Sequence, residues 1–194
     1  MNQKANRIES RDRIDAALDR LVWLLTHERD EGGFPPGDRA ELRRMDPLDT
    51  ALPPSLWHLL TRPEVETAIG FLASEDRETA ERAFGISIQV IAEAGTARGR
   101  PMPIGKALSA TGYAEARFVR LLRARGLEDV AFEARQAAHW CAVNGVSIRL
   151  DGFARYILEA ALGRGEADRS GHSIARDYFA TAMADAQSAA TTET

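Results

Sequence analysis

Residues 98–126 of the chain read RGRPMPIGKALSATGYAEARFVRLLRARG, and their second half has a clear helical pattern. At about 100° of rotation per residue, four apolar residues fall in one arc of a helix: Phe118, Val119, Leu121 and Leu122. The opposite arc holds three arginines: Arg117, Arg120 and Arg123. Gly126 follows where a residue in the left-handed conformation would end the helix. The stretch therefore predicts an amphipathic helix whose solvent-facing side is cationic.

The same stretch carries a charge opposite in sign to that of the chain. It contains seven basic residues and one acidic residue, so its formal charge is +6, whereas the chain of 194 residues has a formal charge of −4. Its one carboxylate, Glu115, reaches only one side of the arginine group, so i,i+4 ion pairs cannot neutralise the rest. An ordinary solvated helix face remains open, because arginine is a good helix former. The unpaired charge favours an anionic partner, most often a nucleic-acid backbone.

Hydrophobic residues recur at helical spacing along most of the chain. Besides the arginine helix, the pattern predicts helices over residues 8–29, 38–44, 64–73, 75–94, 104–110 and 127–143, and two more that start at Asp151 and Ser173. Asp38 with Glu41 three residues later resembles a capping box. Residues 168–171 are expected to form a loop, and residues 146–148 a short extended piece too isolated for a sheet. We expect an all-α fold of eight to nine helices packed as a compact bundle.

The length fits a single helical domain over residues 1–194. The loop at residues 96–103 contains two prolines and is a possible seam between lobes of residues 1–95 and 104–187. The tail at residues 188–194 is small and polar, so we expect it to fray.

Composition excludes several protein classes. One cysteine, Cys141, excludes an internal disulfide framework and indicates a reducing compartment. The sequence contains no apolar run long enough to span a membrane and no signal-peptide hydrophobic region, so we expect a cytoplasmic protein. It also lacks a Gly-rich phosphate loop, a metal-ligand cluster and a nucleophile elbow. We therefore expect no cofactor, no metal and no catalytic role, although carboxylates dispersed over the fold leave an enzyme open.

Further basic residues lie outside the arginine helix. Arg39 and Arg43 share one outer side of their predicted helix, with Arg44 beside them. Arg98 lies in the proline-containing loop, where an arginine loop could hold a nucleic-acid strand or form a solvated linker. Tyr113 is the aromatic residue placed beside the basic face, where it would stack on a base or lie partly buried.

Four segments, in order, resemble the CasB family, the small subunit of the type I-E CRISPR effector complex called Cascade. They are GDRAELRRMDP at residues 37–47, PSLWHLL at 54–60, IGKALSATGYAEARFVRLLRAR at 104–125 and IARDYF at 174–179. The first resembles the early arginine-rich helix of the family, the third its central signature and the fourth its terminal motif.

The resemblance implies an all-helical, non-catalytic protein, present as a pair among the other Cascade subunits. It would contact the hybrid of guide RNA and target DNA and the displaced DNA strand through basic residues, and so stabilise the R-loop. By position, the resemblance carries this role to Arg43, Arg44, Lys106, Arg117, Arg120, Arg123 and Arg135; Arg39 and Arg98 are added on charge alone. The alternative is a helical protein–protein adaptor whose basic face meets an acidic partner.

Overall fold

The computed structural model describes residues 3–72, 76–95, 97 and 99–192, and the side chains of residues 11–188 within these ranges. This part of the chain forms ten α-helices, a short 3-10 helix at Arg29–Glu31 and no β-strand. The α-helices are α1 (Gln3–Thr26), α2 (Pro36–Arg44), α3 (Pro54–Leu60), α4 (Pro63–Leu72), α5 (Arg77–Ala94), α6 (Ile104–Ala110), α7 (Glu115–Arg123), α8 (Gly126–Val143), α9 (Leu150–Ala161) and α10 (Glu166–Thr192). The all-α class is confirmed, but eight to nine helices was too few, because residues 54–60 also form a helix.

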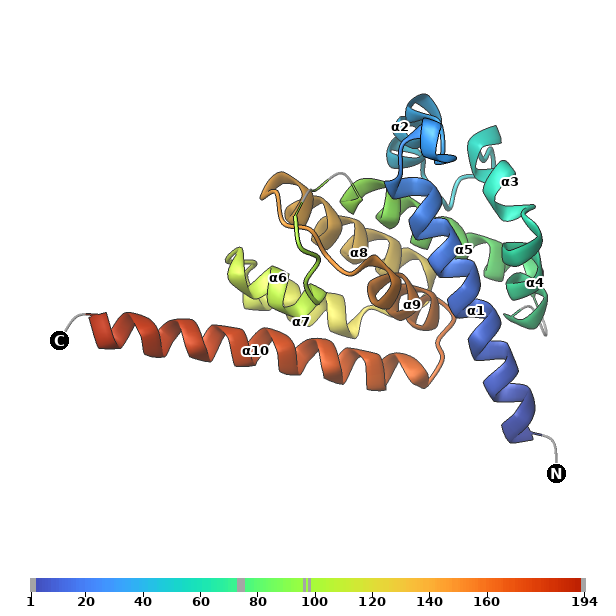
Figure 1. Cartoon of the computed structure of the whole chain (residues 1–194). Helices are drawn as coiled ribbons and strands as arrows, with labels where there is room; N and C mark the ends of the chain where they lie inside the picture. The colour runs from blue at the N-terminus through green and yellow to red at the C-terminus, as the bar shows by residue number, and fades with distance from the viewer. Residues whose placement is uncertain (1–2, 73–75, 96, 98, 193–194) are drawn as a thin grey trace.

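Helix α5 lies at the centre of the fold (Figure 1) and packs against α8 and α9 as well as α1, α2, α3 and α4. All its residues from Ala83 to Ala92 are buried, as expected for a helix surrounded by others. Its two buried polar side chains are hydrogen-bonded. Ser87 Oγ donates to the carbonyl oxygens of Ala83 and Ala154, at 3.2 and 3.3 Å, and Gln89 Nε2 donates to the carbonyl oxygen of Met45. The Gln89 bond fixes the chain just after α2 against the core.

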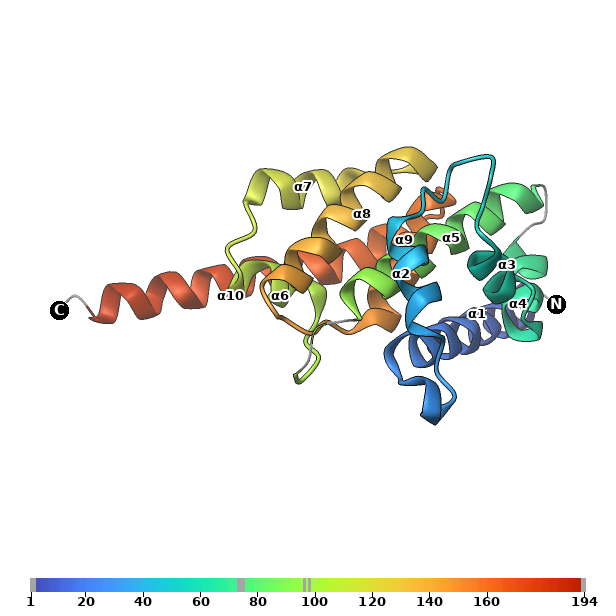
Figure 2. The ribbon, with the colours of Figure 1, turned by 90° about the horizontal axis from the view of Figure 1, so that it is seen from above.

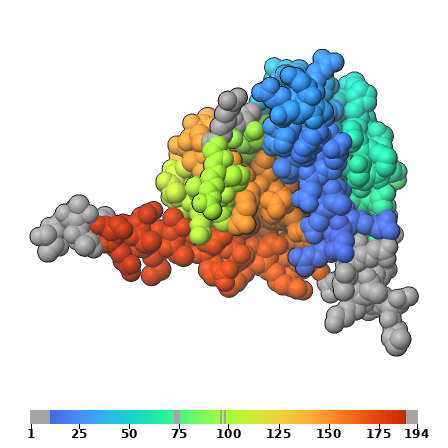
Figure 3. Space-filling view, viewed as in Figure 1, coloured from blue at the N-terminus to red at the C-terminus, as the bar shows by residue number. Residues whose placement is uncertain are grey.

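Helix α10 packs along α6 and α9. Its C-terminal half extends past the other helices, as Figures 1 and 2 show, and the space-filling view in Figure 3 shows the same projection. Exposed side chains on this projecting part include those of Met183, 64% exposed, and Asp185. The body of the molecule is therefore built from α1 to α9 and the first half of α10.

Several predicted helix bounds differ from the structure, and the helix predicted over residues 8–29 is α1 (Gln3–Thr26). α2 begins at Pro36, so Asp38 lies in its first turn and is not the N-cap. α9 begins at Leu150, which likewise places Asp151 inside the first turn. α10 begins at Glu166, so residues 168–171 are helical and not a loop. There, Ser170 Oγ donates to Glu159 at 2.9 Å and Gly171 is buried, so tertiary contacts outweigh weak helix propensity.

The segment between α5 and α6 returns across the fold to meet the segment before α9. The amide of Met102 donates to the carbonyl oxygen of Ser147 at 3.1 Å, and the amide of Arg149 donates to that of Met102 at 2.9 Å. Together they form a single parallel bridge between Met102 and Ile148. This bridge brings residues 99–102 beside Arg149.

Candidate nucleic-acid interface

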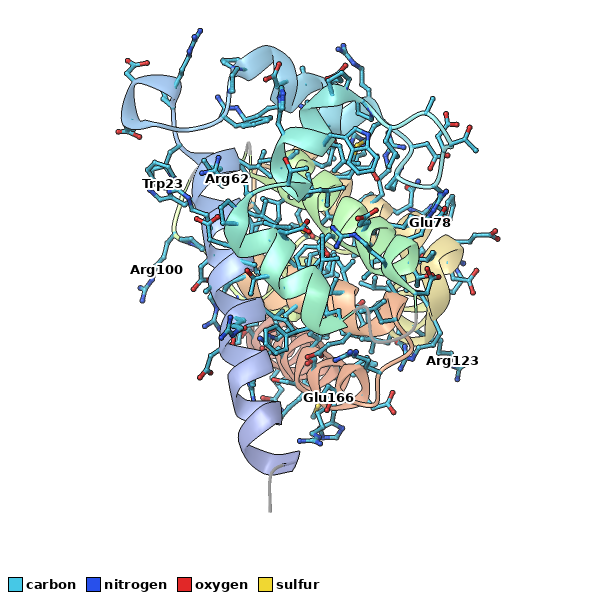
Figure 4. The ribbon with its side chains drawn as sticks, turned by 90° about the vertical axis from the view of Figure 1, so that its right-hand side faces the viewer. Trp23, Arg62, Glu78, Arg100, Arg123 and Glu166 are labelled. Atoms are coloured by element: carbon cyan, nitrogen blue, oxygen red, sulfur yellow. The ribbon has the colours of Figure 1, made fainter. Side chains whose placement is uncertain are left out.

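The positive charge of residues 98–126 does not lie on one surface, contrary to expectation. Figure 4 shows Arg100 and Arg123 at opposite edges of the molecule; in the sequence, α6 lies between the segment that carries Arg100 and α7. Arg125 forms an ion pair with Asp168 at 2.6 Å. Its Nη1 also donates to the carbonyl oxygens of Leu122 and Ala124, where α7 ends, at 2.9 and 2.7 Å. Arg125 therefore joins α7 to α10.

Helix α7 carries the three predicted arginines on its exposed side, and one of them has a partner. Arg120 Nε donates to Glu133 Oε1 of α8 at 2.9 Å, although the side chain of Arg120 is 58% exposed. Arg117 and Arg123 are exposed. Within the described part of the chain, neither forms an ion pair. Glu133 of α8 therefore neutralises part of the positive charge on this face of α7. The i,i+4 spacing within α7 could not reveal this ion pair, because its two residues lie on different helices.

A cationic groove lies beside α2, and we call it the α2 groove. It has a volume of about 700 Å³ and lies between the end of α1, helix α2, the end of α5, residues 97, 99 and 101, and residues 147–151. The charged side chains that line it are those of Arg39, Arg43, Arg149, Glu28 and Asp151. Arg100 is exposed between Gly99 and Pro101, which also line it. Positive groups exceed negative ones here, so this groove suits an anion better than the face of α7 does.

Arg39 has a structural contact as well as a place in the α2 groove. Its Nη1 donates to the carbonyl oxygens of Leu25 and His27, at 3.3 and 3.2 Å. These carbonyls lie at and just after the C-terminal end of α1, where helical carbonyls have no intrahelical donor. The Nδ1 atom of His27 lies within hydrogen-bond distance of the carbonyl oxygen of Trp23, at 2.8 Å. Arg39 thus holds α2 against the end of α1.

Arg135 of α8 reaches the same helix from the other side. Its Nη2 donates to the carbonyl oxygen of Arg43 at 3.4 Å, in the last turn of α2. Arg44, the last residue of α2, is exposed, and so is Lys106 on α6, which is not among the residues lining the α2 groove. Arg98 lies outside the described residues. The structure therefore brings together Arg39, Arg43 and Arg135, and places the α7 arginines elsewhere.

Sequence reasoning did not single out Arg149, which lines the α2 groove. It sits alone between apolar residues, so no local charge cluster marks it. The only available signal was the extended stretch at residues 146–148, which pairs with Met102 in the folded chain.

Tyr113 is unsuited to base stacking, since it is buried at 2% exposure and its ring packs edge-on against Trp140. Burial raises the pKa of its hydroxyl, and the nearby carboxylate of Glu133 raises it further. Cys141 is buried, and desolvation raises the pKa of its thiol to about 12. His139 is exposed, and its Nδ1 lies 2.6 Å from Glu93 Oε1.

Among the described residues, no group of three or more histidine, cysteine or acidic side chains is placed to hold a metal ion. None of the described helices is long and apolar enough to cross a membrane.

The chain also matches a known protein family. The model of the family described as CRISPR-associated protein Cse2 matches residues 38–179. The match begins in α2 and ends in α10, so it includes most of α2, all of α5 and the bridge at Met102, but not the end of α1 that also lines the α2 groove. No curated protein and no solved structure matches the chain.

Proposed function

The chain belongs to the Cse2 family of CRISPR-associated proteins, and on that basis we propose that its α2 groove binds the phosphate backbone of nucleic acid. Family membership makes it a subunit of the Cascade complex, which acts in CRISPR defence. The proposed ligands are the hybrid of guide RNA and target DNA and the displaced DNA strand. By holding them, the subunit would stabilise the R-loop, in the cytoplasm and without catalysing a reaction.

The observation that carries this proposal is the excess of guanidinium groups in the α2 groove. Arg39, Arg43 and Arg149 line it, against Glu28 and Asp151, and they come from two segments far apart in the sequence. Arg100 is exposed between two residues that line it, Gly99 and Pro101. A guanidinium binds phosphate oxygens through a fork of N–H groups and stays charged at all physiological pH values. Contacts to phosphate position nucleic acid without reading its bases. This suits a subunit of a complex in which base pairing with the guide reads the sequence.

The remaining predicted residues extend the proposed interface. Arg135 and Arg44 lie beside Arg43 at the end of α2. Arg117 and Arg123 on α7 and Lys106 on α6 are exposed as well, and each is a further candidate for a phosphate contact. Arg120, which is bound to Glu133, contributes least, since a carboxylate already neutralises part of its charge.

The test is the double variant Arg43→Glu with Arg149→Glu. Arg39 is left unchanged because it holds the end of α1. The control is Arg169→Glu with Arg176→Glu, which makes the same change in charge on two exposed residues of α10. Figure 1 shows α10 on the side of the molecule away from α2. Both double variants should keep the helical circular dichroism spectrum of the unaltered chain.

Binding of a labelled single strand and of an RNA–DNA hybrid is then measured over a series of salt concentrations. For the unaltered chain we expect weak, sequence-independent and strongly salt-dependent binding. The groove variant should lose affinity, and its slope of log affinity against log salt should flatten by about 0.7–0.9 for each lost phosphate contact. The control variant should lose less. Equal losses in both variants would show that the groove has no special role.

The adaptor alternative makes a different prediction. If the unaltered chain ignores both ligands at low salt, yet still assembles with the other Cascade subunits, its basic residues serve an acidic protein partner.

A further inference from the structure

Helix α8 exposes a large aromatic side chain, that of Phe132, which is not among the residues that line the α2 groove. Phe132 is 62% exposed, whereas Trp57 and Phe179 are 42% and 40% exposed. Its ring stands between two hollows. The first, of about 880 Å³, lies between α7 and α8, and the second, of about 470 Å³, lies between α8 and the chain at residues 46–48. Single exposed apolar residues are common on protein surfaces, but one that forms a wall of two hollows is suited to receiving another molecule.

The charges around Phe132 exclude a phosphate backbone as the best occupant. The first hollow is lined by three carboxylates and two arginines: Glu115, Asp129, Glu133, Arg120 and Arg123. The second is lined by Asp46 and Glu128 against Arg135, with His139 already bound to Glu93. Carboxylates outnumber arginines in both hollows, which is the opposite of the α2 groove. A partner that brings positive charge is therefore favoured there.

Glu133 adds an unsatisfied hydrogen-bond acceptor at the first hollow. The residue is only 8% exposed, and its Oε1 accepts from Arg120 at 2.9 Å. Its Oε2 is buried and has no hydrogen-bond partner in the described structure. A buried carboxylate oxygen without a donor is destabilising, so a donor from a bound partner would be favourable after a small shift of the side chain.

We propose that Phe132 and the hollows on its two sides form a docking site for a protein segment of another Cascade subunit, which presents an apolar side chain next to a lysine or arginine. The apolar side chain would pack on the Phe132 ring and against Val119 and Ala116 of the first hollow. The lysine or arginine would lay its apolar stem on the same ring and its charged end among the carboxylates.

This inference rests on membership of a multi-subunit complex and not on nucleic-acid binding. It also explains how one small subunit can serve two kinds of partner. Arg135 lines the second hollow and donates to the carbonyl oxygen of Arg43, so the Phe132 site and the α2 groove are neighbours on the surface. Each could be occupied while the other stays free.

The test compares Phe132→Ala with Val143→Ala. Val143 lies on the same helix, is 65% exposed and lines neither hollow, so its replacement is a matched loss of exposed apolar surface. Each variant is titrated into Cascade assembled from purified subunits without this chain, and binding is measured by native mass spectrometry. Phe132→Ala should weaken binding to the complex about tenfold, as is typical of an aromatic anchor. Val143→Ala should bind as the unaltered chain does, and Asp129→Lys should bind more weakly because it removes the charge that attracts the partner.

Two further measurements decide between occupants. The affinity of the purified Phe132→Ala chain for single-stranded DNA should be unchanged. A tenfold loss there would mean that Phe132 stacks on bases, and would overturn the proposal. Loss of self-association by the variant, with unchanged binding of the single chain to the other subunits, would identify a second copy as the occupant and would also overturn it. Equal binding of all variants to the complex would show that no partner uses this surface.

Discussion

Replacement of Gly105 by alanine should separate two helices that the structure holds in direct backbone contact. Gly105 is buried in α6, where it faces α10. A Cβ at this position would lie 2.2 Å from the carbonyl oxygen of Ile174, 3.0 Å from the amide nitrogen of Tyr178 and 3.1 Å from Cβ of Asp177. Two of these atoms belong to the backbone and cannot rotate away. Since a carbon–oxygen contact needs about 3.3 Å, α6 and α10 would have to move apart by about 1 Å.

The cost follows from what that movement disturbs. Overpacking of a tight contact costs about 1–3 kcal/mol. The hydroxyl of Tyr178 donates to the carbonyl oxygen of Tyr113 at 2.6 Å, and the loss of such a bond costs about 1 kcal/mol. Because alanine is a better helix former than glycine, the substitution also raises the free energy of unfolding by about 1 kcal/mol. We therefore expect Gly105→Ala to lower the free energy of unfolding by about 1–3 kcal/mol, and the melting temperature by about 3–9 °C for a chain of this size.

Thermal unfolding followed by circular dichroism measures this effect, with Gly70→Ala as the control. Gly70 is also inside a helix, α4, but it is exposed and a Cβ there would meet no atom within 4 Å. Its replacement should stabilise the chain by about 0.5–1 kcal/mol through helix propensity alone. The two substitutions are chemically identical and should act with opposite signs. A Gly105→Ala chain as stable as the Gly70→Ala chain would refute the close packing of α6 on α10.

Tyr178→Phe should lower the free energy of unfolding by about 1–2 kcal/mol, because it leaves the buried carbonyl oxygen of Tyr113 without its donor. Chemical denaturation measures this loss, and an unchanged midpoint would contradict the role of the hydrogen bond. Tyr178→Leu should cost more, since it also removes the ring stacked on Phe118 at 3.8 Å between centroids. Cys141, whose thiol pKa is raised from 9.0 to about 12 by burial, should resist alkylation in the folded chain and react after unfolding. Because the unfolded thiol loses its proton first, the free energy of unfolding should fall as the pH rises from about 9 towards 12. Cys141→Ala should remove that part of the pH dependence, and rapid alkylation of the folded chain would show that the thiol is accessible.

Local patterns predicted most of the helices because their signals lie within a few residues. Residues 104–110 form α6 as predicted, since Pro103 starts the helix and Thr111 with Gly112 ends it. The start of α10 was missed for the opposite reason. Residues 168–171 have weak helix propensity, and contacts with α7 and α9, such as that of Ser170 with Glu159, make them helical.

The candidate site was predicted in part. The early arginine helix was recognised from its sequence, and Arg39 and Arg43 do line one groove. The third arginine of that groove, Arg149, comes from a segment that no charge pattern marks, and only the bridge between Met102 and Ile148 brings it there. Conversely, Arg120 and Arg125 have no partner within their own stretch of sequence. In the folded chain they form ion pairs with Glu133 of α8 and Asp168 of α10.

The sequence by itself determined the helical class, the resemblance to a CRISPR-associated family and the number of positive charges between residues 98 and 126. Helical periodicity and residue charge are properties of neighbouring positions, so they can be read along the chain. Only the tertiary structure decided which of those charges share a surface. Arg100 and Arg123 are close in sequence, yet the folded chain places them at opposite edges of the molecule in Figure 4. Surface charge depends on which distant segments pack together, and that is set by burial of the apolar faces, not by the order of the charged residues.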